Sequence, residues 1–277
     1  MTTLPVISAK DFCVTLMIVD HDPPHEQLPI LRQLVDLLPN IEIVHLDIDD
    51  LAVDTPFEGF FHTERFLSSK ITFNMPVHAS DIGRACLLWK FGGVYVDLDV
   101  IVLKTLDRAP QYVARTPHGG IANGILKFHA HSPMLMRYLS NIWTDYNPDQ
   151  YSRLFYVLLE TVHNHCLRKG INIIPEDAYG KQTQGVVEFC DGVNIFGVNA
   201  GLFEPFKTTE ASDTIFNETH GEVFESILKA KDPTVLHYAG NSKGHYRTKM
   251  NVRESDSLFA RMFRKHCPFI TLKYEFV

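Results

Sequence analysis

The residues best suited to chemistry are the two aspartates of the triplet Asp97-Leu98-Asp99. They lie between two apolar, β-rich runs, residues 94–96 and 100–103, where buried side chains rather than charges are expected. In an extended chain, side chains two positions apart point to the same face, about 6–7 Å from each other. Two carboxylates held that close repel unless a cation lies between them. An oxygen-preferring divalent ion such as Mn²⁺ or Mg²⁺ meets that need, and it would also hold a diphosphate.

Two other Asp-x-Asp triplets show that the pattern alone decides little. Asp20-His21-Asp22 and Asp47-Ile48-Asp49 each follow an apolar run that is typical of a strand. Carboxylates at such places are usually solvated strand ends, and we expect no metal at either. The context of the third triplet therefore carries the prediction.

A helix before the Asp97 triplet supplies that context. Ser80-Asp81 is predicted to open it, and Phe91-Gly92-Gly93 to end it, because glycine tolerates the left-handed conformation of a C-cap. Asp81 and Arg84 lie one turn apart near the start of this helix. The Gly-Gly turn is expected to fold the next strand back toward them.

The remaining pattern predicts alternating strands and helices. Strands Val14–Val19 and Ile41–Leu46, with a helix at 28–38 between them, suit a parallel crossover. Residues 47–77 predict a long loop with short helical pieces. Further strands are expected at 119–128 (or a hairpin), 171–174 and 235–238, and further helices at 133–146, 151–167 and 254–266.

Composition limits the classes of protein. At roughly 150 residues per domain, a chain of 277 residues contains one or two domains, and the lack of a linker favours a single domain, 1–277. A hydrophobic content of 45% and a charged content of 21% are those of a soluble protein with a sizeable core. The net charge of -7 argues against a general nucleic-acid binder. The chain shows no apolar run of the ~20 residues that span a bilayer and no signal peptide.

Five cysteines are too few for a disulfide scaffold, and an odd number leaves at least one unpaired. Cys86 lies in the apolar part of the helix and is expected to be a buried free thiol. Cys166 and Cys267 each follow a His-containing segment near a predicted helix end, so these two can pair. Asn217-Glu218-Thr219 is a single N-glycosylation sequon, which is weak support for a secretory lumen.

The stretch from Ser80 to Asp99, with helix, glycines, strand and acidic pair in register, resembles the sugar-nucleotide segment of Asp-x-Asp glycosyltransferases. Within these it is most similar to the α-1,4-glycosyltransferase family. Ala122-Asn123-Gly124-Ile125-Leu126 is similar to the family's Asn-Gly strand, and His237 before Tyr238 and Cys267-Pro268 match in order. The resemblance covers roughly residues 35 to 268.

This resemblance implies an α/β chain of the GT-A fold, a Rossmann-like mixed sheet flanked by helices. It aligns Val14–Val19 with the family's second strand, so that the first strand-helix unit has no counterpart in this chain. It also implies a donor-binding part at about 11–130 and an acceptor-side and C-terminal part at about 131–277.

The resemblance further implies roles for individual residues. Asp97 and Asp99 are expected to bind the metal and the diphosphate, and His237 to be a late ligand near the phosphates. Asp81 and Arg84 are expected to face the nucleotide and sugar. Asn123 and Gly124 would line the donor pocket. No residue is assigned as nucleophile or base.

The hypothesis that follows is a retaining, metal-dependent glycosyltransferase that uses Mn²⁺ or Mg²⁺. It would move galactose or an N-acetylhexosamine from a UDP-sugar to a galactose-ended glycolipid or glycan, in the Golgi lumen. By resemblance, a type II membrane anchor is expected upstream of Met1 in the native gene product. One alternative is a truncated or diverged relative that binds a sugar nucleotide or glycan without turnover. Another is a metal-dependent hydrolase of nucleotide sugars.

Overall fold

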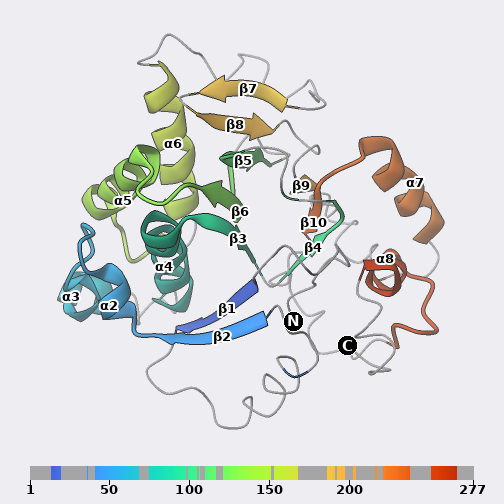
Figure 1. The fold of residues 1–277 in the computed structure, drawn as a ribbon, viewed down its shortest axis with the longest axis horizontal. Helices are drawn as coiled ribbons and strands as arrows, with labels where there is room; N and C mark the ends of the chain where they lie inside the picture. Colours follow the sequence, from blue (N-terminus) through green and yellow to red (C-terminus); the bar gives the residue numbers. More distant parts are fainter. Residues whose placement is uncertain are drawn as a thin grey trace.

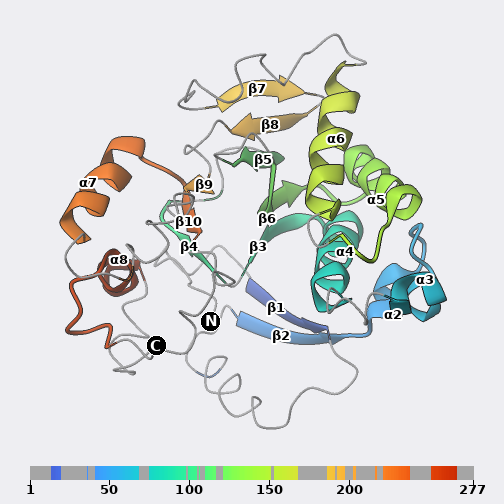
Figure 2. The same ribbon diagram turned by 180° about the vertical axis from the view of Figure 1, so that it is seen from behind.

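The architecture is a mixed α/β fold, seen from opposite sides in Figures 1 and 2. The computed structural model describes residues 14–19, 36, 41–68, 75–97, 99–104, 106, 110–116, 121–150, 153–167, 186–190, 192–196, 202–203, 216, 221–237 and 251–266. Strands in these residues form sheets of five, three and two strands. The predicted class, a mixed sheet flanked by helices as in a GT-A fold, is confirmed.

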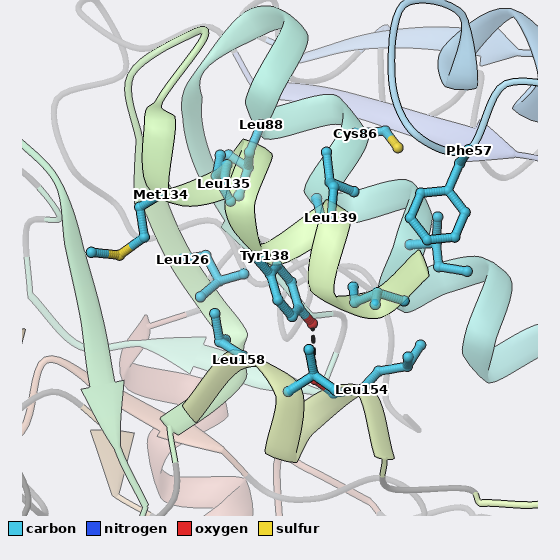
Figure 3. Close-up of a cluster of buried hydrophobic side chains, with 14 of the residues drawn as sticks. Phe57, Cys86, Leu88, Leu126, Met134, Leu135, Tyr138, Leu139, Leu154 and Leu158 are labelled. Atoms are coloured by element: carbon cyan, nitrogen blue, oxygen red, sulfur yellow. Dashed lines mark hydrogen bonds between the residues drawn. The ribbon is translucent and has the colours of Figure 1, made fainter. Parts of the chain in front are cut away.

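The largest sheet has the order β3 (Gly93–Val96), β6 (Ile121–Phe128), β5 (Tyr112–Arg115), β8 (Val193–Phe196) and β7 (Val186–Cys190). Neighbours pair antiparallel except β5 and β8, which run parallel. Three helices pack beside this sheet: α4 (Met75–Phe91), α5 (Pro133–Asp145) and α6 (Arg153–Leu167). Tyr138 lies fully buried among the leucines of this core and donates a hydrogen bond to the carbonyl of Leu154 at 3.1 Å (Figure 3).

A second sheet contains β4 (Val100–Val102), β10 (Val235–His237) and β9 (Leu202–Phe203). Helices α7 (Gly221–Lys231) and α8 (Leu258–His266) lie on its side of the molecule, away from α4, α5 and α6 (Figure 1). Ile101, Leu236 and Phe263 belong to one buried cluster, which joins this sheet to α8. A further cluster joins the two sheets, with members on both: Val100, Val102, Tyr112, Ala114, Ala122, Ile125 and Val235.

The third sheet pairs β1 (Val14–Val19) and β2 (Ile41–Leu46) in parallel, as the crossover prediction required. The expected helix at 28–38 lies outside the described residues, apart from residue 36. Three short helical segments follow β2 and confirm the prediction for this region: α2 (Ile48–Ala52), η1 (Phe60–His62) and α3 (Glu64–Leu67). Phe57 and Phe60 anchor them, because both rings are fully buried and both pack edge-on against Trp143 of α5.

Two predicted helix starts were wrong. Helix α4 begins at Met75 rather than Ser80. Buried His78 explains the extra turn, since its ring contacts the Tyr146 hydroxyl at 3.0 Å and the Gln150 carbonyl at 3.2 Å. Helix α8 begins four residues later than expected, because the Ser257 hydroxyl accepts a hydrogen bond from the Ala260 amide at 3.2 Å and so caps the helix there.

Sequence analysis assigned no element to the residues of helix α7 or of the β7–β8 pair. Each is short, so its apolar period is brief and the tertiary contacts decide its conformation. The strand expected at 171–174 and the residues Gly119 and Gly120 lie outside the described part of the chain.

Candidate functional site

The site forms where α4, β6 and β10 approach the connection between β3 and β4. A glycine at the end of α4 allows the chain to turn into β3. Gly92 has a φ of 66°, and a Cβ built there would lie 2.6 Å from the Ala130 amide nitrogen, so no larger residue fits. Its amide donates to the Leu88 carbonyl at 2.9 Å and ends α4. The chain then turns into β3, which returns toward Arg84 as predicted.

Asp97 and Asp99 lie in the turn between two sheets, not within one extended strand as the sequence suggested. β3 pairs with β6, whereas β4 pairs with β10, so the chain must change direction between them. The Val100 amide donates to the Asp97 carbonyl at 3.3 Å across this turn. The Asp97 amide donates to the Gly124 carbonyl at 2.9 Å and fixes the first aspartate to β6.

Three predicted metal ligands come together at this turn. One ligand atom each from Asp97, Asp99 and His237 lies within 4.8 Å of the others. Antiparallel pairing sets His237 opposite Val100, directly beside Asp99, and the His237 Nε2 is 3.3 Å from the Asp99 Oδ1. The side chains are 23%, 26% and 19% exposed, which leaves each partly open to solvent.

Arg84 links the other predicted residues to this cluster. Its Nη2 is 2.9 Å from Asp81 Oδ1, and its Nη1 is 3.2 Å from Asp97 Oδ1. The same Nη1 donates to the Asn123 carbonyl at 2.8 Å. The side-chain amide of Asn123 in turn donates through Nδ2 to Asp81 Oδ1 at 2.9 Å. Residues of α4, of β6 and of the turn after β3 are thus tied by one buried guanidinium.

Burial shapes the protonation of this network. It raises the pKa of Asp81 to about 6, although Arg84 and the Asn123 hydrogen bond act in the opposite direction and Asp97 adds to the rise. Burial alone lowers the pKa of Arg84, but Tyr95, Asp81 and Asp97 together raise it above its usual value. Arg84 therefore stays charged, and Asp81 is the carboxyl that can carry a proton near neutral pH.

Gly124 leaves room for Asp97. A Cβ at this position would lie 2.8 Å from the Asp97 Oδ2, closer than real contacts allow. The pairing of β5 with β6 also shifts register here: Val113 faces Leu126, but Ala114 faces Ala122. Such a bulge redirects the backbone next to a site. The structure thus places Asn123 beside Asp81 and Arg84, and Gly124 against Asp97.

Sequence reasoning missed Tyr95 and Ser80. The Tyr95 hydroxyl donates to Asp97 Oδ1 at 2.6 Å, and its ring lies 4.6 Å from the Arg84 guanidinium carbon. The Ser80 hydroxyl accepts from Arg84 Nη2 at 3.0 Å. A signal for Tyr95 existed, because it precedes Asp97 by two residues and strand geometry places both on one face.

The second Asp-x-Asp triplet, expected to be a solvated strand end, caps a helix instead. Asp47 Oδ1 accepts from the Asp49 amide at 2.8 Å and caps α2, and Asp49 Oδ2 lies 2.7 Å from His62 Nε2. The triplet at 20–22 lies outside the described residues. Cys86 is a buried free thiol, as predicted, and burial raises its pKa to about 12. Cys166 is disulfide-bonded, whereas Cys267 and Asn217 fall outside the described residues.

Part of the chain matches the model of a known protein family. Residues 8–115 match the model of a family described as "Glycosyltransferase sugar-binding region containing DXD motif". The match includes Asp81, Arg84, Asp97 and Asp99. This part of the chain, under half of its length, is therefore similar to the DXD region of that family.

The chain is also similar to several proteins that are transferases by name. The chain is 28% identical to lactosylceramide 4-alpha-galactosyltransferase of Mus musculus over 156 residues, 53% of this chain and 43% of the relative. It is 27% identical to the Homo sapiens alpha-1,4-N-acetylglucosaminyltransferase over 237 residues, 83% of this chain and 60% of the relative. It is 30% identical to inositol phosphoceramide mannosyltransferase 3 of Schizosaccharomyces pombe over 43% of this chain and 33% of the relative. The predicted resemblance to the α-1,4-glycosyltransferases is confirmed.

The matched segments span less than two thirds of each of these relatives. Among solved structures, one titled "PaToxG Glycosyltransferase" superposes with a TM-score of 0.41 and 18% identity, covering 56% of this chain and 57% of that one. That likeness is too distant to bear on function. Among the helices that the structure describes, none is long and apolar enough to cross a membrane.

Proposed function

We propose that this chain is a retaining, metal-dependent glycosyltransferase. In this proposal it moves galactose or an N-acetylhexosamine from a UDP-sugar to a galactose-ended glycolipid or glycan. The observation that carries the proposal is the convergence of Asp97, Asp99 and His237, with ligand atoms within 4.8 Å of one another, inside and beside a matched DXD region. The fold alone would not carry it, since one fold hosts many chemistries.

The donor set fits a divalent ion. Two carboxylates and one imidazole offer oxygen and nitrogen ligands, and their partial exposure leaves coordination positions for phosphate oxygens. Mg²⁺ favours oxygen ligands throughout, so the imidazole makes Mn²⁺ the better match of the two. When bound, the metal would neutralise the charge that develops on the diphosphate leaving group.

The chain's own residues would orient the donor around that point. Asp81 and Asn123 form a hydrogen-bonded pair that offers carboxylate and amide groups to the sugar or ribose hydroxyls. Arg84 contacts Asp81, Asp97, Ser80 and the Asn123 carbonyl, and its side chain is nearly buried. Its role is therefore to hold Asp81 and Asp97 in place as well as to approach the donor. Retention at the anomeric carbon rests on the resemblance to the α-1,4-glycosyltransferases.

The names of the relatives support the proposed classes of substrate. One relative is a galactosyltransferase by name, and another is an N-acetylglucosaminyltransferase. The galactosyltransferase and the mannosyltransferase act on ceramide-linked acceptors by name. We also propose that the protein works in the Golgi lumen. The disulfide at Cys166 supports that location, because disulfides persist in oxidising compartments.

An assay of nucleotide release tests the proposal. The protein is incubated in Mn²⁺ with UDP-galactose, UDP-N-acetylglucosamine, UDP-N-acetylgalactosamine or UDP-glucose, with and without a lactosyl acceptor. GDP-mannose serves as the comparison, because one relative is a mannosyltransferase by name. We expect UDP release that requires both Mn²⁺ and the acceptor, with one UDP-sugar preferred.

Other outcomes separate the alternatives. Release without acceptor supports a nucleotide-sugar hydrolase, and binding of UDP without any release supports a non-catalytic relative. Release only from GDP-mannose would overturn the proposed donor class while keeping the transferase. Absence of both binding and release would contradict the proposal as a whole.

A further inference from the structure

Tyr95 is a residue of this site to which no role has been assigned. It lies on β3, two positions before Asp97, and directs its hydroxyl at the Asp97 carboxylate. We propose that Tyr95 is a positioning residue that sets the Asp97 carboxylate for metal binding. The inference rests on the metal site proposed above and adds a residue that acts on the metal only through Asp97.

The contact between the two residues is short. The Tyr95 hydroxyl donates to Asp97 Oδ1 at 2.6 Å, a length typical of a hydrogen bond from a hydroxyl to a charged carboxylate. Arg84 Nη1 approaches the same carboxylate less closely, at 3.2 Å from Oδ1 and 3.3 Å from Oδ2. Of these donors, the phenol therefore makes the tighter contact with Asp97.

The ring of Tyr95 is itself held in place. The Arg84 guanidinium carbon lies 4.6 Å from the ring centroid, within the range of a cation–π contact. Since Asp81 and the Asn123 carbonyl fix the same guanidinium, the tyrosine rests on a rigid support. A fixed ring gives its hydroxyl a fixed direction.

Arg84 competes with the metal position for the Asp97 carboxylate. A guanidinium can bind both oxygens of a carboxylate in a bidentate pair. Without the phenol, the Asp97 carboxylate is free to turn fully onto Arg84 and away from Asp99 and His237. On its other side, Gly124 leaves only the space that the Asp97 Oδ2 now fills. Tyr95 and Gly124 together hold the carboxylate between the arginine and the metal position.

The size of the effect follows from other metal sites. Partners that orient a metal ligand typically change metal affinity by about 10- to 100-fold when they are removed. The substitution Tyr95→Phe removes the hydroxyl but keeps the ring against Arg84. We therefore expect Mn²⁺ to bind the variant about tenfold more weakly, with the metal-free melting temperature close to that of the wild type.

The test titrates the whole chain with Mn²⁺ alone and follows free Mn²⁺ by electron paramagnetic resonance. Tyr138→Phe is the matched control, because it also loses one tyrosine hydrogen bond, to the Leu154 carbonyl at 3.1 Å in the α5–α6 core (Figure 3). This control should leave Mn²⁺ affinity unchanged. A double variant with Asp97→Asn should bind Mn²⁺ no more weakly than Asp97→Asn alone.

The outcomes are distinct. Weaker Mn²⁺ binding in Tyr95→Phe, absent from the Tyr138→Phe control and absent in the Asp97→Asn background, supports the positioning role. Unchanged or tighter binding in Tyr95→Phe overturns it while the proposed metal site stands. An additional loss in the Asp97→Asn background would show that Tyr95 does not act through Asp97 and would also overturn it. Failure of the wild type to bind Mn²⁺ overturns the metal site and this inference together.

Discussion

At the residue scale, the site depends on close contacts that leave little freedom to its charged groups. Asp97 is held by its amide on the Gly124 carbonyl, by Tyr95 on Oδ1 and by Arg84. Gly124 also matters, because a Cβ at this position would lie 2.8 Å from Asp97 Oδ2. A metal ligand fixed in this way loses little entropy on binding.

Gly124→Ala should therefore weaken metal binding. The new Cβ would lie 2.8 Å from Asp97 Oδ2 and push the carboxylate out of place. We expect an affinity for Mn²⁺ lower by about tenfold or more. Gly83→Ala is the control: its Cβ would meet only Leu51 at 3.8 Å, and alanine within helix α4 should stabilise the protein by about 0.5–1 kcal/mol. Equal Mn²⁺ affinities for the Gly124 variant and the wild type would refute the role of Gly124 in placing the Asp97 carboxylate.

Asp81 should give the stability of the metal-free protein a distinct pH dependence. Burial raises its pKa from 3.8 to about 6, so the folded state binds this proton more tightly than the unfolded state does. The stabilisation is fully present below pH 3.8 and is lost as pH rises through about 6. Asp81→Asn should remove this loss, which is on the order of 1–3 kcal/mol. Urea unfolding in chelator between pH 4 and 7 measures how the free energy of unfolding changes with pH in the wild type and in Asp81→Asn. The same slope for both proteins would rule out Asp81 as the titrating group.

Sequence reasoning found most of the site, for a physical reason. Asp81, Arg84, Asp97 and Asp99 lie on one helix-turn-strand segment, so their spacing along the chain already fixes their neighbourhood. His237 is distant in sequence, and only the resemblance indicated it. Tyr95 was overlooked because a tyrosine in a strand is ordinarily a packing residue, although its place two residues before Asp97 puts both side chains on one face of an extended chain.

At the scale of elements, the turn between α4 and β3 directs β3 and the Asp97 turn back toward Arg84. The predicted end of the helix was right because Gly92 and Gly93 both adopt positive φ, at 66° and 97°. The start was wrong because a long-range contact, His78 with Tyr146, decides it. The extended geometry expected for the Asp97 triplet was not found, because pairing partners, not local propensity, place β3 and β4 in different sheets.

Gly92→Ala should be more harmful than Gly93→Ala. Both substitutions impose a strained backbone, which costs about 1–3 kcal/mol. At Gly92 the Cβ would also lie 2.6 Å from the Ala130 amide nitrogen, whereas at Gly93 nothing lies within 4 Å. Chemical denaturation should show the larger loss of stability for Gly92→Ala. Equal losses would mean that the contact with Ala130 is not what fixes this turn.

At the scale of the whole molecule, the metal position lies between two sheets. Asp97 is anchored to β6 of the five-stranded sheet, whereas His237 belongs to β10 of the three-stranded sheet. Figure 1 shows the helices of the two parts on opposite sides of this junction. A metal bound by all three residues would therefore link the sheets directly, in addition to the apolar cluster that already joins them.

Binding of Mn²⁺ should accordingly slow hydrogen exchange in β10, on the far side of the junction from α4. At a free concentration of 100 Kd, binding stabilises the bound form by about 2.7 kcal/mol. Strand β7, at the opposite edge of the five-stranded sheet, serves as the internal control and should change little. His237→Ala should abolish the protection. Protection confined to β3 and β6 would show that the metal does not link the two sheets.

The most direct test of the central claim is calorimetric titration of the protein with UDP in the presence of Mn²⁺. Asp99→Ala removes a proposed metal ligand, whereas Asp49→Ala changes an aspartate of another Asp-x-Asp triplet that lies outside the cluster. UDP should bind the wild type and Asp49→Ala in Mn²⁺, and binding should be lost in chelator and in Asp99→Ala. UDP affinity that is the same with chelator, or unaffected by Asp99→Ala, would contradict the assignment of this site.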